Sequence, residues 1–243
     1  MKVNEGLSKA TVQYIHAILH KSLKQALMWG LVSRNVTDLV ERPKPEKKTF
    51  RTWTPEDIKR FLDAVSDHRF FLIYLLAINT GLRQGELLGI HKESVDLKKG
   101  VIHVRHQVST IRGKGLVVTE PKTDKSRRPV TIPKSTKIYL EKHLQGRGDG
   151  LIFTTSTGKP ISPRNLLRHF KQVIEKEGLV MIRFHDLRHT HATLLLAAGV
   201  HPKVVQERLG HSQISLTLDT YSHVIPSLQD EAAEQFDKIV AYS

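Results

Sequence analysis

The residues best suited to chemistry in this chain are cationic and stand at four places along it. These clusters are Arg83, Lys122 with Lys125, Arg127 and Arg128, His185 with Arg188, and His211, and Tyr221 follows the last of them. Two guanidiniums can hold the non-bridging oxygens of one phosphate and stabilise the charge of a pentacoordinate transition state. A phenol that attacks phosphorus must lose a proton and the alkoxide that leaves must gain one, which a histidine and a lysine can provide. Together these residue types suit phosphoryl transfer.

Taken singly, the same residues also have ordinary structural interpretations. Arg83 could form a helix-start salt bridge with Glu86, a hairpin lysine could lie in a solvated turn, and Tyr221 could be a half-buried aromatic side chain. For any one of these residues the structural interpretation is the more common one. The occurrence of the whole set in one chain is what favours the chemistry.

The helix predicted over residues 185–198 has two faces of different character. One face carries Leu187, His191, Leu194, Leu195 and Ala198, whereas the opposite face carries His185, Arg188 and His189. We therefore predict that His191 is a core histidine. The spacing of His185 and His189 would suit zinc, but no Glu follows the first His as in HExxH, and the cationic Arg188 between them opposes a metal ion. The sequence thus predicts an anion at this face and no metal.

The composition also indicates an anionic partner. The chain has 243 residues with 38 Lys and Arg against 24 Asp and Glu, a formal net charge of +14, which points to nucleic acid. Residues 224–243 are acidic instead, and we expect them to contact protein.

The absence of Cys excludes disulfide scaffolds, thiol nucleophiles, zinc fingers and iron–sulfur clusters. No apolar run approaches the ~20 residues of a membrane span, and the N-terminus lacks the apolar core of a signal peptide.

The elements that must position these residues are mainly helical. Capping residues and apolar residues at three- and four-residue steps predict helices at 8–29, 36–40, 54–65, 70–78, 162–177, 185–198, 202–209, 215–222 and 227–240. β-rich segments at 101–108, 115–120 and 128–132 predict a small three-stranded antiparallel sheet. The polar, proline-punctuated residues 41–48 predict a linker and a domain boundary after residue 48. Neither GxGxxG nor GxxxxGKS/T occurs, so no phosphate-binding loop of these kinds is predicted.

Four motifs, taken in order, resemble the signature of the tyrosine recombinases, specifically the phage-type integrases. They are Thr80-Gly81-Leu82-Arg83-x-Gly85-Glu86-Leu87, Pro121-Lys122-Thr123-x-x-Ser126-x-Arg128, His185-Asp186-Leu187-Arg188-His189-Thr190, and Leu209-Gly210-His211-Ser212 followed by Thr220-Tyr221-Ser222-His223. The motifs span nearly all of residues 50–223. The resemblance implies the catalytic fold of DNA breaking and rejoining enzymes over residues 49–223. Residues 1–48 would then be the end of a helical core DNA-binding domain plus a linker, and residues 224–243 a helical segment open to exchange between protomers.

The resemblance also implies roles for individual residues. Tyr221 would be the nucleophile that forms a 3′-phosphotyrosine bond, and Arg83 and Arg188 would clamp the scissile phosphate. Lys122 would be the general acid for the 5′-oxygen. The two histidines expected to assist at the phosphate are His185 and His211.

Supporting roles follow from the same resemblance. Glu86 would orient Arg83, and Asp186 would buttress the turn at His185. DNA contacts are expected from Lys125, Arg127, Arg128 and Arg164. Strand exchange keeps the energy of the broken phosphodiester in the protein–DNA linkage, so no cofactor, metal or ATP is expected.

The implied partners are double-stranded DNA with attachment-type sites and further copies of the chain, from a dimer to a tetramer in synapsis. An accessory DNA-bending protein is a further candidate partner, and no membrane is expected. The expected location is the cytoplasm of a bacterial or phage-infected cell, at the nucleoid. Two alternatives stay open: a catalytically idle DNA-binding remnant, and a nicking and closing enzyme similar to the type IB topoisomerases.

Overall fold

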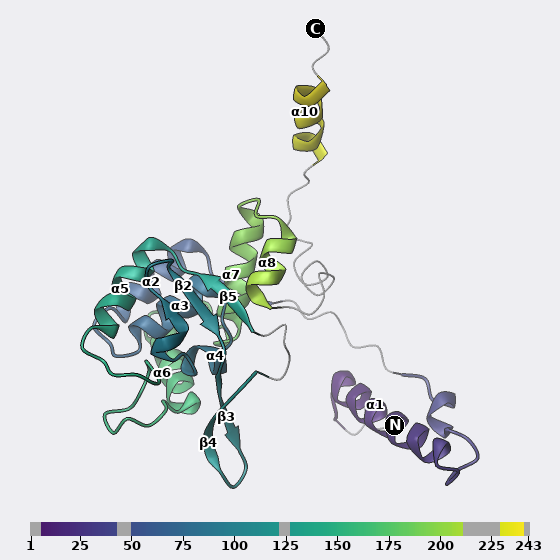
Figure 1. Ribbon diagram of the computed structural model, residues 1–243. Helices are drawn as coiled ribbons and strands as arrows, with labels where there is room; N and C mark the ends of the chain where they lie inside the picture. Colours follow the sequence, from purple (N-terminus) through teal and green to yellow (C-terminus); the bar gives the residue numbers. More distant parts are fainter. Residues whose placement is uncertain (1–5, 43–49, 122–126, 211–228, 241–243) are drawn as a thin grey trace. The chain divides into compact units, whose positions relative to one another are not determined.

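The computed structural model describes residues 6–42, 50–121, 127–210 and 229–240 (Figure 1). The chain divides into two compact units, residues 1–49 and residues 50–243, a division next to the boundary expected after residue 48. Across the described ranges, no helix is both long enough and apolar enough to cross a lipid bilayer.

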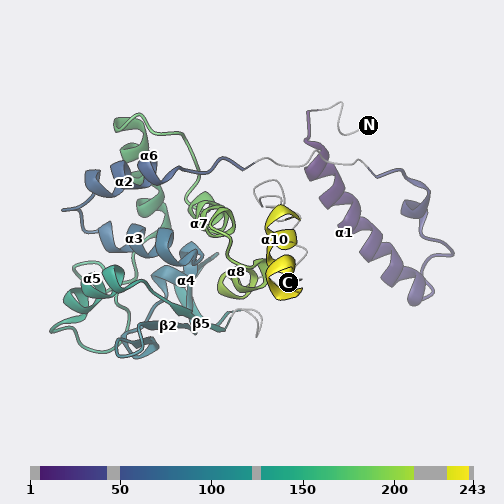
Figure 2. The same cartoon turned by 90° about the horizontal axis from the view of Figure 1, so that it is seen from above.

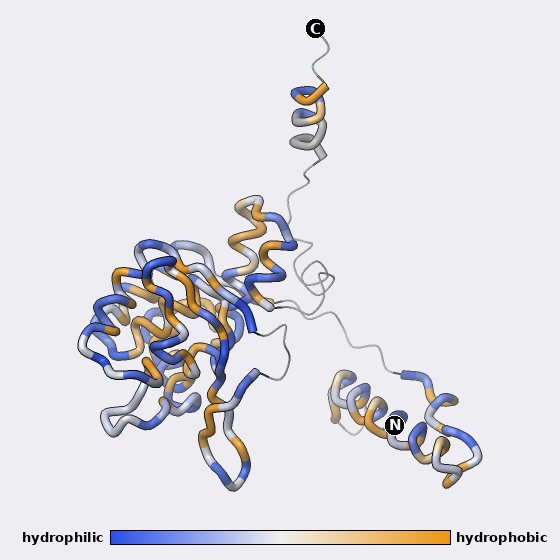
Figure 3. The backbone as a smooth tube through the Cα atoms, in the orientation of Figure 1, coloured by the Kyte–Doolittle hydropathy of each residue, from blue (hydrophilic) through white to orange (hydrophobic). Residues whose placement is uncertain are grey.

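The first unit contains the helix α1 (Lys9–Met28) and the 3-10 turn η1 (Val36–Leu39). The turn packs against the helix, where Nε2 of His16 lies 3.1 Å from the carbonyl oxygen of Thr37 and Nε2 of His20 lies 2.9 Å from Oδ1 of Asp38. Apolar residues recur along α1 (Figure 3), and many of them are exposed. One helix and one short turn are too small to bury such a stripe.

The second unit is built around the helix α3 (Phe71–Thr80), whose residues are nearly all buried. The helices packed around this core are α2 (Pro55–Ala64), α4 (Gln84–Leu88), α5 (Lys134–Leu144), α6 (Pro163–Lys176) and α7 (Asp186–Ala197). The helix α8 (Pro202–Leu209) packs on α7 through a second, smaller apolar cluster. Tyr74 of α3 packs against Phe61 and Phe170, with ring centroids 5.1 and 5.8 Å away. Figure 2 shows α2, α3 and α6 side by side, so an aromatic cluster holds α3 in place.

Two of these helices have no counterpart among the predicted ones. The first is α4, a helix of a single turn. The second is α5, which follows Pro133 and carries few apolar residues, so its amphipathic pattern is weak. Its buried residues Thr136, Leu140 and Leu144 recur at four-residue steps, and only packing against the core distinguishes this face.

The strands differ from the prediction in how they pair. The segment predicted as one strand over 101–108 divides at residues 105–106 into β2 (Val101–Val104) and β3 (Gln107–Ile111). In the described residues, β2 lies between β1 (Val95–Asp96) and β5 (Arg128–Thr131) in an antiparallel sheet, whereas β3 pairs with β4 (Gly115–Thr119) as a separate hairpin. The 3-10 turn η2 (Lys92–Ser94) precedes β1. A three-stranded antiparallel sheet therefore exists, but β1 takes the place predicted for β4.

The ends of α3 and α8 meet beside α7 and form the junction on which the site is built. Gly81 ends α3 with a φ of 64°, and a Cβ at this position would lie 2.7 Å from Cδ2 of Leu209. Only glycine accommodates both the left-handed backbone and this close approach. Figure 2 also shows α8 beside β5. The α3, α4, α7 and α8 ends and β5 therefore converge in one place.

The remaining described element is the helix α10 (Gln229–Val240), which lies within the range predicted over 227–240. The predicted helix at 215–222 falls outside the described residues.

Candidate active site

Arg83 stands at the turn between α3 and α4, where Glu86 holds its guanidinium. The Glu86 carboxylate accepts hydrogen bonds from the Arg83 amide at 2.9 Å and from Nη1 of Arg83 at 2.8 Å. The Arg83 side chain is 38% exposed, whereas the Glu86 side chain is 3% exposed. The turn thus presents a fixed cation that solvent can still reach, which is what binding of an anion requires.

Glu86 itself lies between two guanidiniums, because Arg128 approaches from the other side. Arg128 donates from Nη2 to Oε2 at 3.0 Å and from Nη1 to Oε1 at 3.2 Å. Burial raises the pKa of Glu86, but the hydrogen bonds and charges of Arg128 and Arg83 outweigh burial, and the pKa lies below its ordinary value. The carboxylate therefore keeps its charge and can orient both arginines.

Arg188 lies on α7 at the floor of the same junction and is 3% exposed. It donates from Nη1 to the carbonyl oxygen of Gly81 at 2.8 Å and from Nη2 to that of Leu209 at 2.6 Å. Gly81 ends α3 and Leu209 ends α8, so a single side chain ties the two helix ends together. A cation at the carboxyl end of a helix also interacts favourably with the helix dipole.

His185 precedes α7, is exposed, and lies close to Arg188 and Arg83. Desolvation lowers its pKa, and the charges of Arg188 and Arg83 act in the same direction. The imidazole is therefore neutral at neutral pH and can accept a proton.

Asp186, the first residue of α7, binds Arg183 in the turn that carries His185. Its carboxylate accepts hydrogen bonds from the Arg183 amide at 2.8 Å, and from Nε and Nη2 of Arg183 at 3.1 and 2.7 Å. Burial raises the pKa of Asp186, but the hydrogen bonds and the charge of Arg183 lower it by more, so the pKa lies below its ordinary value. An ionised Asp186 thereby fixes the backbone just before α7.

The prediction that His191 is a core histidine is confirmed. Its ring is buried, with Nδ1 2.8 Å from the carbonyl oxygen of Ile78 and Nε2 2.9 Å from Nε of Arg208. Because Arg208 can only donate, Nδ1 carries the proton and donates to Ile78. Burial and the charge of Arg208 lower the pKa of His191 to about 4. Its neighbour His189 stacks instead on Phe50, with ring centroids 4.0 Å apart.

The residues predicted to contact DNA fall into different environments. Arg127 is 51% exposed and pairs with Glu120, and Arg164 is exposed in the first turn of α6. Arg128 departs from the prediction, because it is 8% exposed and its guanidinium is bound to Glu86 and to the carbonyl oxygen of Arg208. The reason is the pleat of β5: side chains along a strand alternate between faces, and Arg128 begins the buried set.

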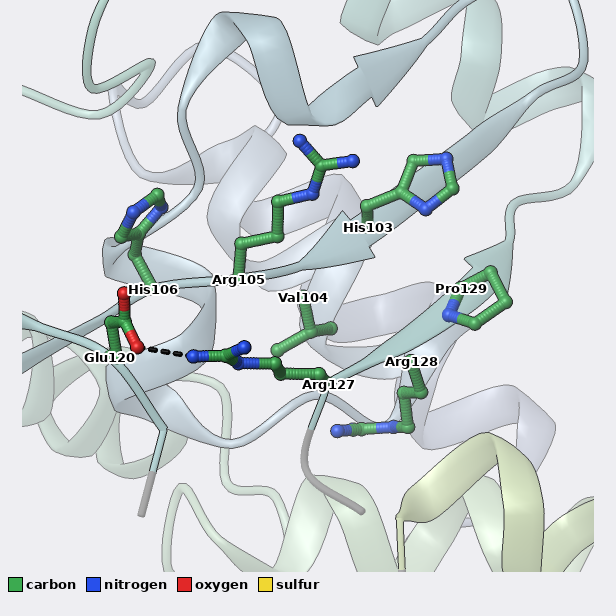
Figure 4. Close-up of a pocket in the computed structure, with 8 residues that line it drawn as sticks. All are labelled: His103, Val104, Arg105, His106, Glu120, Arg127, Arg128 and Pro129. Atoms are coloured by element: carbon green, nitrogen blue, oxygen red, sulfur yellow. Dashed lines mark hydrogen bonds and ion pairs between the residues drawn. The ribbon is translucent and has the colours of Figure 1, made fainter. Parts of the chain in front are cut away.

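A basic cavity of about 360 Å³ lies beside β2 and the start of β5 (Figure 4). Its basic lining residues are His103, Arg105, His106, Arg127 and Arg128, and Glu120 is the acidic member. Figure 4 shows Arg127 directed towards Glu120, whereas the Arg128 side chain points elsewhere. The cavity adds exposed positive charge next to the junction.

The structure thus brings together the four site residues Arg83, Glu86, His185 and Arg188, and Asp186 is the first residue of α7, next to His185. Four other predicted site residues, Lys122, Lys125, His211 and Tyr221, lie outside the described residues. Sequence reasoning missed Arg208 and Arg183, which hold His191 and Asp186. Their signal is weak because neither stands in a motif. In the described part of the chain, no three His, Cys, Asp or Glu side chains gather as metal ligands.

Comparisons with known proteins identify the family of this chain. The family model for the phage integrase family matches residues 51–227. The chain is 33% identical to a "Tyrosine recombinase XerC-like" protein of Caldanaerobacter subterraneus subsp. tengcongensis, over 97% of this chain and 68% of that protein. It is 31% identical to the ICEBs1 integrase of Bacillus subtilis, over 97% of this chain and 67% of that one. The chain thus spans about two thirds of the length of these relatives.

Solved structures show the same fold. The Tn1549 transposon integrase in complex with a circular intermediate DNA matches with a TM-score of 0.81 and 23% identity, over 97% of this chain and 81% of that chain. The XerA recombinase matches with a TM-score of 0.61 and 25% identity, over 81% of this chain and 67% of that chain. With the match over residues 51–227 and the relative at 33% identity, the chain belongs to the phage integrase family and is a tyrosine-type site-specific recombinase.

Proposed function

We propose that this recombinase cleaves and rejoins double-stranded DNA through a covalent bond between Tyr221 and the 3′-phosphate. The Tyr221 oxygen attacks the scissile phosphorus, the bond from phosphorus to the tyrosine forms, and the bond to the 5′-oxygen breaks. The phenolic proton passes to a base and the 5′-oxygen gains a proton. One phosphodiester replaces another, so the step needs no ATP.

The observation that carries this proposal is the meeting of two arginines at one junction. Arg83 is anchored by a buried carboxylate yet reaches solvent, and Arg188 is buried at the same junction, where it binds the carbonyl oxygens of Gly81 and Leu209. Charges act more strongly at such a partly buried place than in water. Arg83 would bind the non-bridging oxygens from above, and Arg188 would stabilise the added charge of the transition state from the floor of the site.

Three residues are proposed for the proton transfers. His185 is neutral at neutral pH because desolvation and the arginine charges lower its pKa, which suits a proton acceptor. Lys122 would donate a proton to the 5′-oxygen, and His211 would assist at the phosphate. The resemblance of the sequence motifs supports these two assignments.

The proposed partners are double-stranded DNA and other copies of this chain. The Tn1549 transposon integrase was solved with a circular intermediate DNA, and the net charge of +14 agrees with such a partner. Lys125, Arg127 and Arg164 are proposed to contact DNA, with residues 1–48 acting as part of a core DNA-binding domain. Phe236 and Ile239 of the helix α10 are exposed, which agrees with exchange of residues 224–243 between protomers in a dimer or tetramer. We also propose that the chain acts at the nucleoid and that an accessory protein bends the DNA.

The test is a nicked suicide duplex that carries the cognate site, incubated with the protein in EDTA and resolved by denaturing electrophoresis. We expect a covalent protein–DNA adduct that Tyr221→Phe abolishes. A verified site that yields no adduct with the unaltered protein would favour a DNA-binding role without catalysis.

A second measurement separates recombination from simple nicking and closing. Two duplexes with the site are mixed, and products that join one to the other are counted against relaxation of a supercoiled plasmid that carries a single site. Recombinant products support the proposal. Relaxation without them would favour an enzyme similar to the type IB topoisomerases.

A further inference from the structure

We propose that Arg128 is a positioning residue that holds Arg83, through Glu86, in a fixed relation to the carboxyl end of α8. This inference rests on the proposed function, since it gives Arg128 a task in phosphate activation. It also replaces the expectation that Arg128 contacts DNA. The contacts of its guanidinium carry the argument.

The first contact joins Arg128 to the residue that orients Arg83. Nη2 and Nη1 of Arg128 bind the two oxygens of Glu86 at 3.0 and 3.2 Å, and the same two oxygens receive the amide and Nη1 of Arg83 at 2.9 and 2.8 Å. Each carboxylate oxygen thus accepts from both arginines. A shift of Arg128 would pull the carboxylate with it and change the direction in which Arg83 points.

The second contact joins Arg128 to α8. Its Nε donates to the carbonyl oxygen of Arg208 at 2.7 Å. The last carbonyls of a helix have no partner within the helix and carry the negative end of its dipole, so a guanidinium stabilises them. Arg188 binds the next carbonyl, that of Leu209. Two arginines therefore hold the end of α8 by consecutive carbonyl groups.

The fit around this guanidinium is close. A Cβ at Gly210 would lie 2.9 Å from Nη1 of Arg128 and 3.1 Å from its Cδ. Gly210 also has a φ of 69°, which disfavours any other residue. The glycine that ends α8 thus leaves the space that Arg128 occupies, and the next residue in the sequence is His211.

These contacts connect Arg83 and Arg188, the two arginines proposed to bind phosphate, to the same helix end, that of α8. Arg188 links α8 to the end of α3, and Arg128 links α8 to Arg83 through Glu86. Lysine could supply the charge of Arg128 but not its planar set of donors. The geometry, rather than the charge alone, is what we infer the site requires.

The experiment compares Arg128→Met and Arg128→Lys with the unaltered protein on the nicked suicide duplex. Cleavage is measured in single turnover at saturating protein, with the dissociation constant for DNA and the melting temperature measured alongside. Each protein is also given a duplex with a methylphosphonate at the scissile position. That group lacks one charged oxygen, so its cleavage depends less on a well-placed Arg83.

Two further proteins calibrate the comparison. Arg83→Ala serves as the reference for loss of the phosphate arginine. Arg60→Met serves as a control for the loss of an arginine that binds a helix end, because the exposed Arg60 donates to the carbonyl oxygen of Glu177 after α6 and lies outside the site.

We expect both Arg128 variants to cleave the phosphodiester roughly 10- to 100-fold more slowly, the scale of a small misplacement of a catalytic group. Their DNA affinity should change little. The ratio of methylphosphonate to phosphodiester cleavage should rise towards that of Arg83→Ala. This ratio is taken within one protein sample, so partial unfolding cancels from it.

Three results would overturn the inference while leaving the proposed function in place. The first is an equal slowing of both substrates, which would mean a purely structural role. The second is normal cleavage by Arg128→Lys, which would mean that charge alone suffices. The third is a loss confined to DNA affinity, which would restore the role of a DNA contact. Failure of the unaltered protein to form any adduct would instead refute the proposed function.

Discussion

Arg127 and Arg128 are neighbours in the sequence and both line the basic cavity, yet one side chain is exposed and the other is buried. Arg127 lies on the rim of the basic cavity, half exposed, with Glu120 as its partner. Arg128 lies in the buried junction, between Glu86 and the end of α8. On the rim a cation is available to a phosphate and its ion pair contributes little to folding. In the junction a cation is committed to the protein, and removal of its partner leaves a buried charge.

The largest effect should come from the carboxylate at the centre of the junction. Glu86→Ala leaves the buried Arg128 without its counter-ion, and we expect the free energy of unfolding to fall by about 3–5 kcal/mol. Denaturant unfolding followed by circular dichroism measures it. A loss below 1 kcal/mol would mean that the junction is solvated like the rim.

The next effect depends on pH and comes from His191. Its pKa in the folded protein is about 4, below the 6.5 of the unfolded chain, so the unfolded state binds a proton first as the pH falls. Stability from the neutral ring is present above pH 6.5 and is lost between pH 6.5 and 4, by up to ~3 kcal/mol. Other histidines with lowered pKa values also make the free energy of unfolding depend on pH. The measurement therefore compares the pH dependence of this free energy in the unaltered protein and in His191→Gln. An equal pH slope in both proteins would contradict the neutral, buried ring.

A smaller effect should follow from filling the space beside Arg128. Gly210→Ala forces a left-handed backbone at a cost of about 1–2 kcal/mol and also brings a Cβ against the guanidinium. Gly199→Ala is the matched control, because Gly199 has a φ of 77° but nothing within 4 Å of the added Cβ. The difference in unfolding free energy between the two variants isolates the contact with Arg128. If the free energy of unfolding falls equally in the two variants, the close contact between Gly210 and Arg128 does not contribute to stability.

The smallest effect on folding is expected on the rim. Arg127→Ala should change the unfolding free energy by about 0–1 kcal/mol, as for an exposed ion pair. Its effect should appear instead in DNA binding, where loss of one phosphate contact lowers the slope of log affinity against log salt by about one. An unchanged salt slope would remove Arg127 from the DNA-binding surface.

Local pattern was sufficient for much of the fold. The helices predicted at 54–65, 162–177, 185–198 and 202–209 agree with α2, α6, α7 and α8, and capping residues, prolines and glycines mark their ends. The sequence pattern did not predict which strands pair with each other when the strands are far apart in sequence. The segment 101–108 is continuous in β-forming residues, yet its two halves belong to different sheets, and its partners are chosen by packing rather than by propensity.

The candidate site likewise has residues that the sequence predicts and residues that it does not. Arg83, Glu86, His185, Asp186 and Arg188 could be named from residue types and motif order, and the structure gathers them at one junction. The buried position of Arg128 could not be predicted, because a motif shows that an arginine is present but not which face of a strand carries it. Arg208 could not be found at all, since its partners His191 and Asn79 are distant in sequence.

By itself the sequence determined the residue types that phosphoryl transfer requires, their order along the chain, and the helix ends that glycine, proline and capping residues enforce. Those properties depend on chemistry and on interactions between near neighbours. The tertiary structure alone decided which arginines face solvent and which are buried among carbonyl groups, because burial depends on segments far apart in sequence. That distinction separates Arg127, which we propose to contact DNA, from Arg128, which we propose to hold the site together.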